Sequence, residues 1–319
     1  MLDSTVSVII PVLNGGSWLR EAVESCLNQS WPEVEVIVVD NGSTDGSLEV
    51  ARAIGAENLL VTSCSTPGAS AARNLGIDSC RGDYIQFLDA DDVLHRDKIA
   101  NQMRRLAHKP QGSVASGAWA RFEHTLAEAT FLREPVWRDL SPVDFLVTSW
   151  LGGGMIPVFA WLTPRLVVDE AGPWDESLSL NDDGEYFTRI VLAGAGVVFC
   201  EGAKGYYRTA PLITLSQRRD RQAAESALRS ASLSCRRLLR TESSVAAYRA
   251  CATAMKRVAY STYPEHPDIS AQAGRMARSF GGSDLQFGGG ATTKLAVALF
   301  GWRIACRLQR WRRRLRGER

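Results

Sequence analysis

The sequence has little of what metal or disulfide frameworks are built from. It contains four histidines and seven cysteines in 319 residues, without a Cys-x-x-Cys pair. Scattered cysteines in odd number disfavour a disulfide framework or a zinc site and favour a reducing cytosol. The histidines have no ligand spacing, so we expect surface positions for all of them: His95, His108, His124 and His266.

Long apolar runs are missing too. No stretch approaches the ~20 apolar residues of a membrane-spanning helix. The N-terminus enters the run 6–10 without a basic segment, which disfavours a signal peptide. A composition of 45% hydrophobic and 23% charged residues is typical of a soluble globular protein. We therefore expect a cytoplasmic protein, although the net charge of +2 hides an arginine-rich C-terminal end.

The first half of the chain alternates strand and helix signals. Short β-branched or apolar runs at 6–10, 35–39, 58–62 and 84–88 are separated by helical patterns near 17–27, after Thr44 and after Gly68. This alternation predicts an α/β fold with a doubly wound, mostly parallel sheet.

The second half is less regular. We expect a helix near 97–107, a strand at 113–122, irregular chain at 123–160, a helix starting near 181–183, a strand at 197–200 and helices from about 217 onward. The patterns divide the chain into an α/β domain (1–215), a helical extension (216–280), a glycine-rich linker (281–290) and a basic C-terminal helix (291–319).

Three carboxylates follow the apolar run 84–88: Asp89, Asp91 and Asp92. Like charges packed this closely repel one another, and each resists loss of water. Mg²⁺ relieves both costs, because it takes oxygen ligands and keeps positions open for substrate phosphates. The carboxyl end of a strand in an open α/β sheet is a usual ligand site. The alternative is an acidic turn before the next helix.

Polar turns also follow the first two strands, at 11–14 and 40–46. An amide or carboxylate there can bond a nucleobase edge, and a helix N-terminus behind it favours anions; ordinary turn chemistry is the alternative. The small residues of 67–72 allow close backbone approach, and Arg73 follows one turn into that helix. Arg73 is suited to a nucleotide or a carboxylate partner, or is simply a solvated arginine on a packed helix.

In this order and spacing, PVLN, VVDNGSTDGS, PGASAARNLG and GDYIQFLDADD resemble the motifs of family 2 glycosyltransferases with the GT-A fold. The resemblance spans residues 6–92 and implies transfer of a sugar from a nucleoside diphosphate donor, usually with inversion, assisted by Mn²⁺ or Mg²⁺. It implies that Asp91 is the principal metal ligand and that Asp89 faces the metal or the ribose. The nucleotide-binding residues we expect are Pro11, Asn14, Asp40, Asn41, Arg73 and Asp89. Asp40-Asn41 stands where many members carry two aspartates, so the identity of the donor's nucleobase is left open.

Inverting transfer needs a general base for the acceptor hydroxyl. The family's acidic pair, with an arginine six residues on, matches Asp182-Asp183 and Arg189 here, which implies that Asp183 is the base. Asp183 shares a helix face with Phe187, so partial burial raises its pKa, while the helix N-terminus opposes that rise. The alternative is a helix cap.

We expect the sugar and acceptor pocket at Gly153, Gly154, Trp174, Asp175 and Asp182; a flexible loop and a packed aromatic turn are the alternatives. Tyr207-Arg208 resembles a tyrosine–arginine pair found late in the sequence of these catalytic domains. Many family members have a histidine two residues after that arginine. Ala210 stands there instead. This implies a metal held by Asp91, the diphosphate and water.

The last segment, 292–316, reads as one helix with an apolar stripe and arginines mainly off it. The stripe is Val297, Ile304, Leu308, Trp311 and Leu315. Such a helix suits an anionic membrane surface through residues 291–316; docking on its own domain or a second subunit is the alternative. Nucleic acid is not expected, because the aromatics fall on the apolar stripe.

The sequence thus predicts a cytoplasmic, metal-dependent, inverting glycosyltransferase, peripheral on the inner face of the membrane, with a glycan or lipid-linked acceptor in polysaccharide biosynthesis. One competitor is a nucleotidyltransferase, which wants a basic glycine-rich loop after the first strand; residues 11–17 contain no basic residue. Another is a sugar-nucleotide-binding or membrane-associated protein without turnover, which intact Asp89, Asp91 and Asp183 disfavour.

Overall fold

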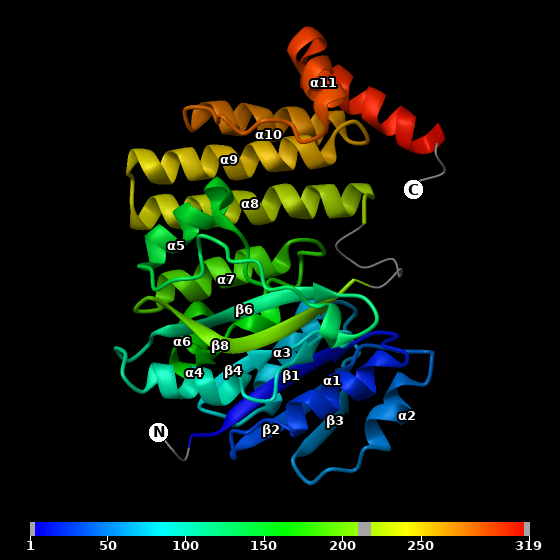
Figure 1. The fold of residues 1–319 in the computed structure, drawn as a ribbon, viewed down its shortest axis with the longest axis vertical. Helices are drawn as coiled ribbons and strands as arrows, with labels where there is room; N and C mark the ends of the chain where they lie inside the picture. Colours follow the sequence, from blue (N-terminus) through cyan, green and yellow to red (C-terminus); the bar gives the residue numbers. More distant parts are fainter. Residues whose placement is uncertain (1–3, 210–217, 316–319) are drawn as a thin grey trace.

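The computed structural model describes residues 4–209 and 218–315, with side chains described up to Arg312. Its first layer is a five-stranded sheet of order β3-β2-β1-β4-β7 (Figure 1). Strands β1 (Val6–Val12), β2 (Val34–Asp40), β3 (Leu59–Ser63) and β4 (Tyr84–Phe87) are parallel, and β7 (Thr163–Pro164) pairs antiparallel with β4. The expected α/β class with a mostly parallel sheet is confirmed.

The central strands read as continuous apolar runs because both of their faces are covered. In β1 only Pro11 is not fully buried, as is usual for a parallel strand between helical layers. The crossovers are α1 (Trp18–Leu27), α2 (Ser47–Arg52) and α3 (Ala69–Ser79). All parallel strands therefore end at one edge, where the polar turns gather.

A second sheet of order β5-β8-β6 lies beside the first (Figure 1). It contains β5 (Val93–Leu94), β6 (Val114–Phe122) and β8 (Val197–Arg208), with α4 (Lys98–Leu106) between the first two in sequence. In the structure, the strand that we expect at 197–200 is three times longer, because β8 continues past a register shift at Gly117/Ala118 of its partner β6. This extension carries Arg208 to the acidic turn.

The segment expected to be irregular, 123–160, contains helical turns. They are η1 (Leu126–Glu128), α5 (Pro142–Thr148), η2 (Ser149–Gly153) and η3 (Val158–Ala160). Helix α5 begins with a serine cap: the Ser141 hydroxyl accepts from the Asp144 amide, and proline follows at the first helical position. Helices α6 (Arg165–Ala171) and α7 (Asp182–Ala193) complete this half.

The C-terminal helices form a stack on α7 (Figure 1). They are α8 (Arg221–Thr241), α9 (Val245–Thr262) and α10 (Pro267–Ser279). Buried side chains of α8 and α9, such as Leu238 and Met255, belong to the same apolar core as the sheets. Burial therefore couples the helical extension to the site-bearing half.

The last helix is not the single helix expected. Helix α11 (Ala291–Leu315) is interrupted at Gly301, whose φ of 77° and ψ of 162° are not helical. Glycine has no Cβ and adopts this backbone at little cost, so α11 consists of two limbs. Among the described residues, no helix is both long and apolar enough to cross a bilayer.

Candidate functional site

The acidic turn after β4 is clamped from β8. Asp92 is almost fully buried, and its Oδ1 accepts a hydrogen bond from the Arg208 amide at 2.9 Å. The Arg208 guanidinium donates from Nε to the Asp91 carbonyl at 2.8 Å and pairs with Glu21 of α1. One buried arginine thus fixes the backbone of the turn that presents Asp89 and Asp91.

The carboxylates of this turn are partly or fully buried and lie close enough for the charge of one to raise the pKa of the next. Burial, followed by the charge of Asp89, raises the pKa of Asp91 to about 6. Burial and then Asp91 raise the pKa of Asp92 well above its ordinary value. Within the described residues, no three histidine, cysteine or acidic side chains form a metal cage. Two carboxylates beside a phosphate-bearing substrate suit Mg²⁺, which seldom takes an all-protein cage, so the turn fits a divalent cation.

Arg73 of α3 connects the acidic turn with the start of α7. Its side chain is buried, and its guanidinium lies 3.0 Å from Asp89 Oδ1 and 3.0 Å from Asp182 Oδ2. The guanidinium carbon also lies 4.4 Å from the ring centroid of Trp174. A buried cation requires such partners. The two acidic motifs, about ninety positions apart in sequence, therefore meet at one arginine.

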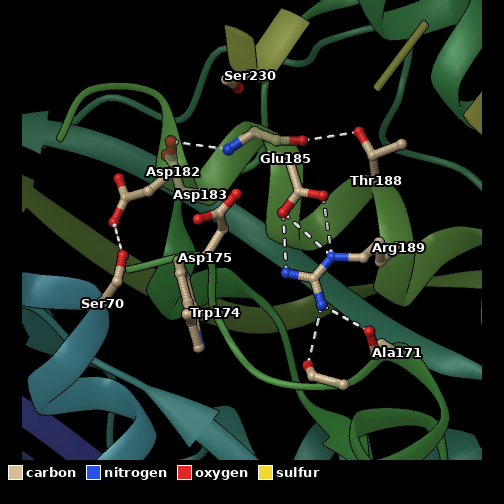
Figure 2. A network of polar contacts seen from close by, with 12 residues as sticks. Ser70, Ala171, Trp174, Asp175, Asp182, Asp183, Glu185, Thr188, Arg189 and Ser230 are labelled. Carbon is tan, nitrogen blue, oxygen red and sulfur yellow. Dashed lines mark hydrogen bonds and ion pairs between the residues drawn. The ribbon is translucent and has the colours of Figure 1, made fainter. Parts of the chain in front are cut away.

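Asp182 and Asp183 are adjacent but differ in their bonding. Asp182 Oδ2 accepts from Ser70 Oγ at 2.9 Å (Figure 2) and also from Arg73. Among the described residues, Asp183 Oδ1 accepts from a single neighbour, the backbone amide of Gly184. Burial, then the charge of Asp182, raises the pKa of Asp183 to about 6. A half-buried carboxylate with that pKa can take a proton near neutral pH.

The loop before these aspartates is held by α8. Asn181 adopts the left-handed region at φ 59°, which is costly for a residue with a Cβ. Ser230 Oγ accepts from Asn181 Nδ2 and donates to the Asn181 carbonyl, each at 2.6 Å. Ser226, one turn earlier, accepts from the amides of Ser179 and Leu180. The helical extension therefore determines where Asp182 and Asp183 lie.

The expected pocket residues lie in two places. Trp174 is buried beneath Arg73 and stacks on Tyr186 with ring centroids 3.9 Å apart. Asp175 beside it accepts from Ser177 and pairs with Arg229. The glycines come from a different loop, at the end of η2: a Cβ on Gly153 would meet Thr148, and one on Gly154 would meet Glu134. Sugar or acceptor contact by these residues remains a prediction.

The expected nucleotide-binding residues gather at the carboxyl edge of the sheet. Asn14, at φ 56°, accepts from the Thr44 amide at 2.9 Å, which ties the loops after β1 and β2. The Asp40 carboxylate accepts from the Gly42 and Ser43 amides. Asn41 Oδ1 accepts from the Gly68 amide at 2.7 Å. Pro11 lies in β1 itself. Their contact with a nucleotide remains a prediction.

Some site residues were missed by the sequence analysis. Ser70 lies in the run of small residues at 67–72, and its place there was a signal that could have identified it. Glu21, Ser226 and Ser230 carry no local signal, because their partners are far away in sequence. Arg189, part of the matched spacing, pairs with buried Glu185 and donates to the carbonyls of Ala171 and Gly172 (Figure 2). Ala210 lies outside the described residues.

Three relatives match between 31% and 58% of the chain. An uncharacterized glycosyltransferase of Haemophilus influenzae is 43% identical over 101 residues, 31% of this chain and 40% of that protein. Another, of Rickettsia typhi, is 37% identical over 187 residues, 58% of each chain. Glycosyltransferase GlyA of Streptococcus pneumoniae is 30% identical over 39% of this chain and 18% of its own. The chain thus spans less than two thirds of these relatives.

Solved structures with a similar fold extend over most of the chain. The S. aureus TarS fragment 1–349 in complex with UDP-GlcNAc superposes with a TM-score of 0.62 at 16% identity, over 88% of this chain and 93% of that one. The mannosyltransferase PcManGT of Pyrobaculum calidifontis, in complex with GDP-Man and Mn²⁺, superposes with a TM-score of 0.55 at 19% identity, over 96% of this chain and 86% of that one.

The family comparison agrees with the motifs. The model of glycosyl transferase family 2 matches residues 7–162, from β1 through the acidic turn to the segment before β7. Residues 7–162, just under half of the chain, therefore match glycosyltransferase family 2.

Proposed function

We propose that the protein transfers a sugar from a nucleoside diphosphate donor to an acceptor hydroxyl, with inversion at the anomeric carbon. The observation that carries the proposal is the bridge made by Arg73, which brings Asp89 and Asp182 to one guanidinium. A diphosphate-binding turn and a proton acceptor are both required for this reaction. The bridge supports their action on one substrate.

The proton acceptor in this proposal is Asp183. As the acceptor oxygen attacks the anomeric carbon, its proton passes to the Asp183 carboxylate, and the bond to the diphosphate oxygen breaks. Inversion requires attack from the face opposite the leaving group. The neighbouring Asp182 is occupied by Ser70 and Arg73, which leaves Asp183 for the proton.

A divalent cation, Mn²⁺ or Mg²⁺, belongs to the proposal. Asp91 and Asp89 would hold it, and when bound it stabilises the negative charge that develops on the diphosphate leaving group. Arg208 and Glu21 keep the turn in place for this role. Burial and then the charge of Asp89 raise the pKa of Asp91, and this supports the assignment because a bound cation would relieve both costs.

The donor class follows from fold relatives that were solved with UDP-GlcNAc or with GDP-Man. We propose a nucleotide sugar of this kind without choosing the base or the sugar. The acceptor in the proposal is a glycan or lipid-linked glycan of polysaccharide biosynthesis. Cytoplasmic placement at an anionic membrane surface completes it.

Ligand-induced thermal shifts test the donor and metal roles together. In a panel of nucleotide sugars, we expect at least one to raise Tm with Mn²⁺ present and much less without it, because binding to the native state stabilises it. Asp91→Asn should remove most of the Mn²⁺-dependent part. Asp78→Asn, which changes an exposed carboxylate on α3, is the control.

An unchanged Mn²⁺-dependent shift in Asp91→Asn would contradict the metal assignment. A transferase of the proposed kind releases a nucleoside diphosphate from a nucleotide sugar. If the protein instead releases pyrophosphate from a nucleoside triphosphate, that result would favour a nucleotidyltransferase. Donor binding with no product under any condition would favour a binding protein without turnover.

A further inference from the structure

The two limbs of α11 expose large apolar side chains that its own domain leaves uncovered. The exposed fractions range from 43% for Leu308 to 64% for Leu299. In the structure the apolar stripe consists of six exposed side chains, of which only the last three belong to the stripe expected from the sequence: Leu295, Leu299, Phe300, Ile304, Leu308 and Trp311. An exposed apolar surface of this kind, rimmed by polar residues, marks an interaction site.

The opposite side of the second limb is docked on the body. Ala305 and Cys306 are buried, and Cys306 Sγ donates to the Tyr263 carbonyl at 3.4 Å. The Trp302 ring lies 5.1 Å from that of Tyr263. The Arg312 guanidinium donates to Thr292 Oγ1 at 3.0 Å and ties the end of one limb to the start of the other. The docked side fixes which side faces outward.

The charge of the segment selects the partner. Residues 291–319 contain one acid, Glu318, and many bases: Lys294, Arg303, Arg307, Arg310, Arg312, Arg313, Arg314, Arg316 and Arg319. A second copy docking on this surface would set these cations against their equivalents. An anionic surface instead gains from each basic residue within about a Debye length. Arg303 and Arg307 are exposed beside the stripe.

We propose that α11 is an interfacial anchor that lays its apolar stripe on a bilayer containing anionic lipid. The break at Gly301 allows both limbs to present apolar side chains, and α11 lies at the end of the molecule remote from the five-stranded sheet (Figure 1). The arginines beside the stripe lie at the headgroup level. The anchor specifies the membrane contact that the proposed function includes, and it does not depend on the transfer reaction.

Co-sedimentation with vesicles tests the anchor. The full-length protein should pellet with vesicles of phosphatidylcholine and phosphatidylserine and stay in solution with phosphatidylcholine alone or in 0.5 M salt. The double variant Leu308→Ser/Trp311→Ser should lower the bound fraction at least ~10-fold at limiting lipid, because it removes two inserting side chains. Leu132→Ser, which changes an exposed leucine elsewhere, is the matched control and should bind as the unmodified chain does.

Equal binding by the double variant, equal binding to both vesicle types, or no binding to anionic vesicles would each overturn the anchor. A concentration-dependent doubling of mass without lipid, abolished by Leu308→Ser/Trp311→Ser, would assign the stripe to a second copy instead and would also overturn it. None of these readouts requires turnover, so they leave the transferase proposal standing or falling on its own test.

Discussion

At the residue scale, the site separates two neighbouring carboxylates by their partners. Asp182 is bonded to a cation and a hydroxyl, and Asp183 accepts from a single backbone amide. Burial raises the pKa of Asp183 to about 6, whereas the Asp182 carboxylate is occupied by the hydrogen bonds from Ser70 and Arg73. The pair thus combines a carboxylate held in place with an adjacent proton acceptor.

This difference predicts the pH dependence of turnover. Asp183 works only when deprotonated, so kcat should fall tenfold per pH unit below about pH 6, the value to which burial raises the pKa of Asp183. Nucleoside diphosphate release, measured from pH 4.5 to 8 at saturating donor, provides the profile. A rate that stays level down to pH 4.5 would contradict the role.

Unfolding at this group cannot produce the same fall. The native state binds the Asp183 proton more tightly than the unfolded chain, because the native pKa is raised. Protonation of Asp183 at acidic pH therefore stabilises the folded state relative to the unfolded chain. This contribution of Asp183 is lost as the pH rises through about 6. A constant circular dichroism signal over the same range is the control.

At the element scale, the sequence pattern was sufficient for the first half. Strands β1, β2, β3 and β4 and helix α1 lie within two residues of their expected bounds, and α3 begins directly after Gly68, because apolar periodicity and turn residues are local signals. The extension of β8 was missed, since its long pairing with β6 is a tertiary effect. Helix α5 was missed as well, although Ser141 and the proline after it are a start signal.

The break in α11 had a visible cause, since Gly301 stands in the middle of the expected helix. The contact of α8 with the loop before α7 had no such signal in the sequence. Ser226 and Ser230 look like ordinary helical serines, and only the tertiary fold aligns them with Leu180 and Asn181. What the sequence could not predict is therefore mainly the cross-chain support of the site.

That support predicts a role for Ser230 as a positioning residue. Ser230→Ala removes both of its hydrogen bonds to Asn181, each of which contributes about 0.5–1.5 kcal/mol to stability. The loop should relax, and kcat should drop several-fold while KM for the donor hardly changes. Steady-state kinetics separate the two quantities.

The matched control is Ser232→Ala on the same helix, because that hydroxyl bonds the Leu228 carbonyl of its own helix. Equal kinetics for both variants would show that α8 supports only the fold. A rise in KM for the donor with unchanged kcat would also contradict positioning of the proton acceptor.

At the scale of the whole molecule, one apolar core joins both sheets and the helical stack. On one side of that core the strands end at the acidic turn. On another side α8 holds the loop of Asp182 and Asp183, and Arg73 closes the distance between the two. The helical extension therefore contributes directly to the site, and the family match to residues 7–162 ends before the proposed proton acceptor.

The most direct test of the account is nucleoside diphosphate release by Asp183→Asn, with the most stabilising nucleotide sugar at saturation and Mn²⁺ present. Asparagine keeps the shape and cannot accept the proton. The account predicts a rate at least ~10²-fold lower, with donor affinity unchanged by calorimetry. A rate equal to that of the unmodified chain would remove Asp183 from the reaction and contradict the central claim.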